Sequence, residues 1–265
     1  MRAHLVFALL LTLVLGACAS SSPPRTASAR IDDEEMAAIS ASVFEQLKSK
    51  NQLSADYQAH SLVRCVTDHL VAELSEEDRA LRWETVVFED NDALIYALPG
   101  GKLGVHQGLL AMTIDEAQLA AAIAHELGHI AQGHAADRVS AEFTLEAAVA
   151  AAQTYRGDQG PQPSKELYAL LGLGALVGEP RPYSAEQERE ADLASLRLLA
   201  RAGYPVEAAP ALWQRLADQP QAESIDWLAS HPQPGRRAND LRSALASVSV
   251  DVEAARAAGS QPRCR

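Results

Sequence analysis

The chain has 265 residues, of which 48% are hydrophobic and 22% charged, and its formal net charge at pH 7 is -12. This composition is that of a globular protein with a sizeable core, and it excludes a chain that is disordered throughout. The excess of acidic residues argues against nucleic-acid binding and against a polybasic contact with anionic lipid, because both need clustered positive charge.

The N-terminal segment predicts an export signal that is removed from the mature protein. Arg2 gives it a basic start, an apolar run fills residues 5–15, and the small residues Gly16 and Ala17 end it. The run is shorter than the about 20 residues that a membrane-spanning helix needs. We therefore assign residues 1–17 to a lipoprotein signal peptide.

Cys18 predicts how the mature chain is attached to a membrane. The Leu-Gly-Ala-Cys ending resembles the bacterial lipobox, in which the cysteine becomes the acylated first residue. The following segment is rich in serine, alanine and proline, so residues 18–31 are expected to form a lipidated tether. Ala19 in place of aspartate favours the outer membrane, by analogy with bacterial sorting. We expect a periplasm-facing envelope protein; the alternative is an ordinary secretory signal with an incidental cysteine.

Residues 32–106 predict two helices followed by a small sheet. Apolar residues recur at helical spacing in two runs over residues 32–75. Residues 83–88, 93–98 and 102–106 carry strand patterns, and the Gly-Gly pair between the last two is a hairpin signal. We expect a small antiparallel β-sheet beside the helices.

Helices dominate the rest of the chain. Residues 115–152 predict helix with one interruption, and residues 184–202 predict a strong helix closed by a glycine. The glycines and prolines of residues 155–183 predict a mobile loop over the site. The expected fold is a mostly helical α+β domain over residues 32–245, followed by a C-terminal tail over residues 246–265.

Two further cysteines, Cys65 and Cys264, remain if Cys18 carries a lipid. Cysteines of an exported protein pair in an oxidising compartment. We therefore expect a disulfide that ties the C-terminal tail to an early helix. The alternative is two unrelated thiols, because the sequence does not show whether they approach within disulfide distance.

The segment His125-Glu126-Leu127-Gly128-His129 carries the strongest chemical signal in the chain. Two histidines four residues apart on a helix project from one face about one turn apart, so both can bind one metal ion. Glu126 lies beside them, and its carboxylate can take a proton from an attacking water and pass it to the leaving amine. The preceding apolar residues indicate a buried helix, where a metal would satisfy the imidazoles. Imidazole and carboxylate ligands with an open fourth position are typical of catalytic zinc.

A third protein ligand is expected from the acidic helix of residues 184–202. Glu188 shares a helical stripe with Asp192, whereas Glu186 and Glu190 are each rotated about 200° away. We predict Glu188 as the third ligand and Asp192 as the acceptor of the free ring N–H of a ligand histidine. The alternative is a charged solvated face, which explains Glu186 and Glu190 but not an aspartate within the apolar stripe.

His134 does not fit the other common metal scheme, in which a third histidine ends an extended motif. Gln132 stands where that motif has glycine, and Ala135 stands where it has histidine. We expect His134 to lie at a helix end or beside a ligand rather than on the metal.

Several short motifs in one order resemble a known family. They are the Ala-Leu-Pro-Gly-Gly of residues 97–101, the Gly-Leu-Leu of residues 108–110, the motif from His125 to His129 with His134, Tyr183-Ser184 before Glu188 and Ala191-Asp192, and His231-Pro232. Over about residues 32–245 the chain is similar to the HtpX/CAAX-protease-like zinc metallopeptidases (gluzincins), in their periplasmic, BepA-like branch. It looks like a lipoprotein form of this branch without a repeat module.

The resemblance implies a gluzincin-type fold, one zinc ion per chain held by His125, His129 and Glu188, and Glu126 as the general base. It also implies a catalytic role for His231, because the histidine of this His-Pro pair lies close to the zinc in similar proteins. His231 then either stabilises the tetrahedral intermediate or occupies the open metal position and keeps the enzyme latent. The alternative is a histidine that only caps the following helix.

Three positions depart from the family pattern: Leu94 replaces an asparagine, Ala185 an arginine and Ser195 a glycine. None of them is an expected ligand. The missing asparagine and arginine leave open which residues hold the substrate strand and Asp192.

Two functions of different classes follow from these residues. The first is an endopeptidase that cleaves unfolded or misassembled envelope proteins, laid along the edge of the small sheet. The second is a lipoprotein that binds such proteins without cleaving them and assists the outer-membrane assembly machinery. Glu126 favours the first, because a binding protein would not need that carboxylate. A third possibility, a zinc-stabilised scaffold, requires four protein ligands, the fourth supplied by His231.

Overall fold

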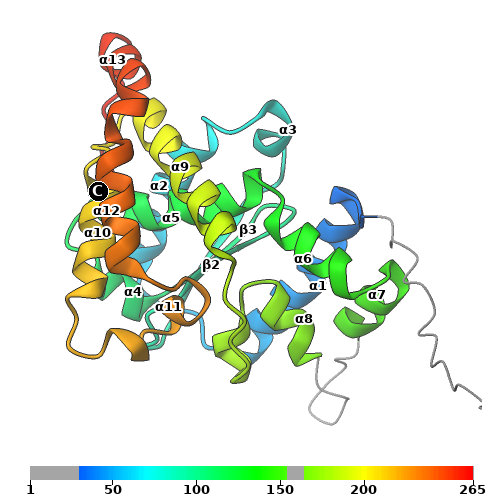
Figure 1. Ribbon diagram of the computed structural model, residues 1–265. Helices are drawn as coiled ribbons and strands as arrows, with labels where there is room; N and C mark the ends of the chain where they lie inside the picture. Colours follow the sequence, from blue (N-terminus) through cyan, green and yellow to red (C-terminus); the bar gives the residue numbers. More distant parts are fainter. Residues whose placement is uncertain (1–29, 154–163, 265) are drawn as a thin grey trace, which may run out of the picture.

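Two long helices, α5 (Glu116–Ala131) and α9 (Ala185–Ala202), lie side by side at the centre of the computed structural model (Figure 1). The structure describes residues 30–153 and 164–264. Helices surround this pair and a small sheet packs beside α5, so the expected mostly helical α+β fold class is confirmed. Tight packing of α5 against α9, the sheet and α10 (Ala208–Ala217) makes the pair the centre of the hydrophobic core.

The segments predicted to attach the chain to a membrane are not described. The signal peptide of residues 1–17 and Cys18 lie outside the described residues, as does most of the tether of residues 18–31. Among the helices in the described part of the chain, none is both long and apolar enough to cross a membrane.

The two N-terminal helices have the positions that their apolar spacing predicts. Helix α1 (Asp33–Lys50) begins at Asp32, whose carboxylate accepts the backbone N–H of Glu35 while the Glu35 side chain accepts that of Asp32. This reciprocal pair satisfies two N–H groups that a helix start leaves free. Helix α2 (Tyr57–Val71) buries one face against α5 and the sheet. A short helix, α3 (Glu76–Arg79), leads into the first strand.

The sheet has three strands in the order β1-β3-β2. Strands β2 (Ile95–Leu98) and β3 (Lys102–His106) form the predicted antiparallel hairpin, and Gly100 and Gly101 at its turn have the positive φ angles that glycine adopts most readily. Strand β1 (Glu84–Phe88) is parallel to β3. The sheet is therefore mixed, and the antiparallel prediction was wrong for β1. The strand pattern fixes which residues face the core, but it does not fix which strands become neighbours.

The glycine- and proline-rich segment is more ordered than the sequence suggests. Its residues 154–163 lie outside the described residues. Beyond them, α8 (Lys165–Leu170) buries apolar side chains in the core, and the partly buried Leu176 and Val177 of the 3-10 helix η1 (Gly174–Val177) pack against it. The prediction of a mobile loop was wrong for residues 165–170 and 174–177, because these residues form helices whose apolar side chains pack on the core.

The remaining helices cover both sides of the central pair. In Figure 1, α10 and α12 lie to the left of α9, and α1, α7 and α8 group at the lower right. Helix α9 has the predicted bounds, since Ser184 caps its start and Gly203 ends it with a φ of 85°. The bounds of the other elements are α4 (Gln107–Met112), α6 (His134–Glu142), α7 (Leu145–Gln153), η2 (Ala222–Ser224), α11 (Asp226–Ser230), α12 (Pro234–Ala244), η3 (Leu245–Val248) and α13 (Ser249–Ala257).

The C-terminal segment packs on the domain. Helix α13 contacts α9, and Cys264 beyond it forms a disulfide with Cys65 of α2. The backbone N–H of Cys264 donates to Glu116 in the first turn of α5 (2.9 Å), and the Tyr204 hydroxyl donates to the other carboxylate oxygen of Glu116 (3.1 Å). The residues expected to form a tail thus connect α2, α5 and α9.

Replacing Cys65 and Cys264 by serine is expected to lower the free energy of unfolding by about 2–5 kcal/mol, because the disulfide closes a long loop in the unfolded chain. Urea unfolding without reductant measures the loss. Either single variant should lose as much as the double variant, because each one removes the same bond, and reductant should affect only the wild type. A double variant as stable as the oxidised wild type would contradict the prediction.

Candidate active site

Helix α5 holds the predicted motif residues in the interior. Asp115 caps the helix through a hydrogen bond from Gln118 N–H (2.8 Å). His125, Glu126 and His129 are each at most 3% exposed. The two histidines point the same way, with their Nε2 atoms 3.1 Å apart. One helix turn therefore presents two imidazoles at one buried point.

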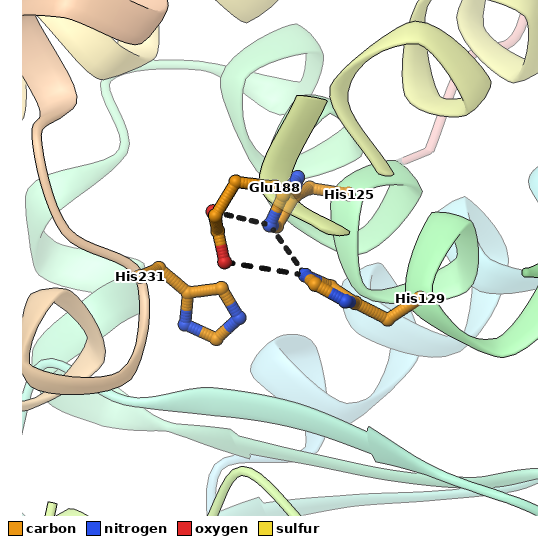
Figure 2. A group of neighbouring side chains, drawn as sticks. All are labelled: His125, His129, Glu188 and His231. Atoms are coloured by element: carbon orange, nitrogen blue, oxygen red, sulfur yellow. Dashed lines mark hydrogen bonds and ion pairs between the residues drawn. The ribbon is translucent and has the colours of Figure 1, made fainter. Parts of the chain in front are cut away.

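Helix α9 brings the predicted carboxylate to this point. Glu188 Oε2 lies 3.6 Å from His125 Nε2, and Glu188 Oε1 lies 3.6 Å from His129 Nε2 (Figure 2). The approach depends on Gly128, because a Cβ there would lie 2.6 Å from the backbone oxygen of Ala191. The glycine inside the motif lets the two helices come together where the three side chains meet.

His231 joins the same cluster from the end of α11. Figure 2 shows its ring facing the other three side chains. Its Nδ1 lies 3.1 Å from the backbone oxygen of Trp227, so Nδ1 carries the proton and Nε2 has a free lone pair. One ligand atom from each of His125, His129, Glu188 and His231 can be chosen so that all four lie within 4.8 Å of one another. The structure thus brings together the three expected ligands and His231.

The donor atoms of this cluster fit a metal ion. Within the described residues, His231 Nε2 is buried and receives no hydrogen bond, and the buried carboxylate of Glu188 has only the ion pair with Arg237 Nη1 besides its contacts with the two imidazoles. Burial lowers the pKa of His125 and of His129 well below the usual value, so both rings are neutral and have lone pairs to offer. Burial also raises the pKa of Glu188 to about 8, and a nearby cation would favour its ionised form.

The balance of buried charges also indicates that the cluster binds a metal ion. The buried acidic side chains in the described part of the chain are Glu126, Glu188 and Asp192, whereas the buried lysine or arginine is Arg237 alone. These four side chains together have two more negative charges than positive charges when they are ionised. A divalent cation would neutralise that excess, which is otherwise costly in an interior.

Glu126 is held between the ligands and the sheet. Its Oε1 accepts the indole N–H of Trp227 (2.8 Å), and its Oε2 accepts the backbone N–H of Ala97 in β2 (3.3 Å). Burial raises its pKa to about 8, against these two hydrogen bonds, which favour the ionised form. A carboxyl with a pKa near neutrality can both take and return a proton.

Asp192 occupies the predicted position beside His125, with Oδ1 3.1 Å from its Nδ1. Arg237 of α12, which the sequence analysis missed, donates to both oxygens of Asp192 (2.9 and 2.6 Å) and contacts Glu188 through Nη1. Its guanidinium lies over the ring of Trp213. Arg237 therefore holds Asp192, the role that could not be assigned because Ala185 replaces the usual arginine. In the sequence, the one feature that points to Arg237 as a site residue is its position shortly after His231-Pro232.

His134 lies beside the expected metal ligand His129, as predicted. Glu190 contacts His134 instead of facing only solvent. His134 Nδ1 is 2.8 Å from His129 Nδ1, and His134 Nε2 is 3.1 Å from Glu190 Oε2. Seen on its own helix, Glu190 points away from the metal ligands, which is why it was assigned to a solvated face. Helix α6 supplies the partner, because it begins shortly after α5 and its first residue, His134, reaches Glu190 of α9.

Comparison with known proteins agrees with this geometry. Residues 57–245 match the family model of Peptidase family M48. The chain belongs to peptidase family M48. Its buried cluster of His125, His129 and Glu188, built on a motif of the HExxH type, is therefore the candidate metallopeptidase site.

Three relatives indicate how distant the similarity is. The chain is 31% identical over 175 residues to mitochondrial metalloendopeptidase OMA1 of Schizosaccharomyces pombe; the aligned part covers 65% of this chain and 50% of that protein. It is 27% identical over 220 residues to the β-barrel assembly-enhancing protease of Yersinia pestis, with 79% of this chain and 43% of that protein covered. It is 29% identical over 161 residues to metalloprotease YcaL of Escherichia coli (61% and 61%). The chain thus spans less than two thirds of each relative.

Gly128→Ala is expected to destabilise the protein by about 1–3 kcal/mol and to weaken metal binding, because the new methyl group must push α9 away from α5. Urea unfolding and zinc titration of the metal-free protein measure both effects. Gly235→Ala in α12 is the matched control, because its Cβ would meet only Ala217 at an ordinary 3.6 Å. Equal stability of the two variants would contradict a close helix contact at Gly128.

Proposed function

We propose that the protein is a zinc-dependent endopeptidase that hydrolyses peptide bonds in unfolded or misassembled cell-envelope proteins. The observation that carries the proposal is the position of Glu126. Its carboxylate lies beside the metal ligands and is fixed by Trp227 and by the backbone of Ala97. A purely structural metal site would have no need for this buried acid.

Zinc is the metal that this donor set favours. Two imidazoles and one carboxylate are a common set of protein ligands for catalytic zinc. His125, His129 and Glu188 would hold the ion, which would supply positive charge that polarises the scissile carbonyl and lowers the pKa of the attacking water. Glu126 takes the proton of that water and passes it to the amine that leaves. Asp192 fixes the ring of His125 during these steps.

The edge of β2 is the proposed position of the substrate chain. β2 pairs with β3 along one edge, and no strand within the described residues pairs with its other edge. On that side, the N–H of Ala97 points at Glu126. An extended peptide that adds to this edge would pass beside Glu126, and main-chain pairing of this kind needs an unfolded segment. The proposed substrates are therefore unfolded proteins.

The envelope location rests on the sequence and on the cysteines. The signal peptide and the lipobox at Cys18 support a periplasm-facing lipoprotein of the outer membrane. The disulfide between Cys65 and Cys264 agrees with an oxidising compartment. One relative is called a β-barrel assembly-enhancing protease, which supports misassembled outer-membrane proteins and their assembly machinery as partners.

We assign His231 to the fourth ligand position in the closed site. Its free Nε2 is one of the four clustered ligand atoms, and it is 3.5 Å from Glu126. Burial lowers the pKa of His231 to about 3, so the ring is neutral and can bind a metal. A His231 ring bound to the ion would leave no place for a substrate carbonyl and would keep the enzyme latent.

Glu126→Gln is expected to reduce casein cleavage by about 10²- to 10⁴-fold while the protein still binds zinc, because the amide cannot accept the proton. Zinc content and cleavage rate are measured on the same samples. Glu186→Gln is the control, because Glu186 pairs with Arg189 at the surface. If the wild type cleaves no unfolded protein but binds unfolded outer-membrane proteins, the binding-only function replaces the enzyme.

His231→Ala is expected to retain zinc and to cleave casein faster than the wild type, because it frees the fourth ligand position. His60→Ala in α2 removes a histidine outside the cluster and should change neither property. A loss of about 10²- to 10³-fold in His231→Ala would instead assign this residue to stabilising the transition state.

A further inference from the structure

The two histidine ligands of the proposed zinc site are supported in different ways. His125 contacts a carboxylate directly, because its Nδ1 lies 3.1 Å from a carboxylate oxygen of Asp192. His129 has a histidine in the corresponding place, since its Nδ1 lies 2.8 Å from Nδ1 of His134. Behind that histidine, Nε2 of His134 lies 3.1 Å from Glu190 Oε2. The second ligand therefore reaches a carboxylate through one intervening ring.

The short nitrogen–nitrogen distance fixes the protons of this chain of groups. Of the two Nδ1 atoms, one must donate and the other accept, because two lone pairs or two N–H groups would repel each other. His129 Nε2 faces His125 and Glu188 and must keep its lone pair to bind a metal. His129 Nδ1 therefore carries the proton and His134 Nδ1 accepts it. Neutral His134 then has its proton on Nε2, which donates to Glu190.

We propose that His134 and Glu190 form a positioning pair that fixes the tautomer and orientation of His129 for zinc binding. The inference rests on the zinc site of the proposed function. It gives His134 and Glu190 a task that neither the peptidase motif nor the ligand set requires. Neither residue touches the substrate, and both act through His129.

The local packing leaves His129 few other orientations. Gly133 has a φ of 68°, and this left-handed turn between α5 and α6 carries His134 back to the preceding helix turn. Tyr183 packs against the face of the His129 ring in a tilted arrangement, with ring centroids 3.9 Å apart. The face of the ring is thus held by packing, while its Nδ1 edge is held by His134. His134 itself is 3% exposed, so water does not replace this contact easily.

Glu190 differs from its neighbour Glu186 in the partner that it meets. The Glu186 carboxylate contacts Arg189 of the same helix, and both side chains are more than half exposed. The Glu190 side chain is 40% exposed and reaches across to α6. Ion pairs on a solvated helix face contribute little, whereas a carboxylate that orders a buried ring affects the site. The two glutamates therefore form a matched pair for a test.

Zinc affinity of the full chain, measured by competition with a chromogenic chelator, tests the pair. His134→Leu removes the acceptor and is expected to weaken zinc binding by about 10- to 100-fold. His134→Asn places an oxygen where Nδ1 was and should recover most of the affinity. Glu190→Ala should weaken binding by a smaller factor, and Glu186→Ala should leave it unchanged. Wild-type affinity in His134→Leu would overturn the inference.

A second measurement separates positioning from a general loss of structure. Nitrogen-15 NMR of the metal-free protein reports which nitrogen of His129 carries the proton. The wild type should show Nδ1–H alone, and His134→Leu should show both tautomers with an unchanged fold. A single Nδ1–H tautomer in His134→Leu would contradict the proposal. A wild type that binds no zinc would contradict the proposed function instead, so the two failures are distinct.

Discussion

The close contact of α5 with α9 at Gly128 is the constraint on which the site depends. Two histidines on one helix do not complete a set of metal ligands. The carboxylate must come from a second helix, at a position level with the two rings. A glycine opposite the backbone of Ala191 lets the helix axes approach closely enough for Glu188 to meet both rings. The motif therefore contains a packing residue as well as chemical ones. The surrounding helices, the sheet and the C-terminal segment hold this pair in place.

A second constraint is electrostatic. The site removes Glu126, Glu188, Asp192 and Arg237 from water, and each charge must find compensation in the interior. Arg237 offsets part of the negative charge, and the remainder matches a divalent cation. Binding of such an ion would contribute to the stability of the fold as well as to chemistry, because the ligands are brought together only in the folded chain. Folding and function of this protein would thus be coupled through the buried charged side chains and the ligands of one site.

Much of the architecture could be predicted from single segments of the sequence. Helical spacing was sufficient to select Glu188 over Glu186, and to place Asp192 beside His125. The predictions failed where the answer depends on how separate segments meet. The parallel pairing of β1, the contact of His134 with Glu190, and the position of Arg237 all involve partners that are distant in sequence. Periodicity shows which face of an element is buried, but it contains no information about the partner.

The disulfide has a consequence for the covalent topology of the molecule. Cys65 and Cys264 are 199 positions apart, and both segments that supply metal ligands, as well as His231, lie between them. The active site is therefore enclosed in a covalent ring. A single cut of the backbone within this ring, including one made by a neighbouring copy of the enzyme, would leave two fragments joined through sulfur. Such a nicked molecule would migrate as one chain until it is reduced.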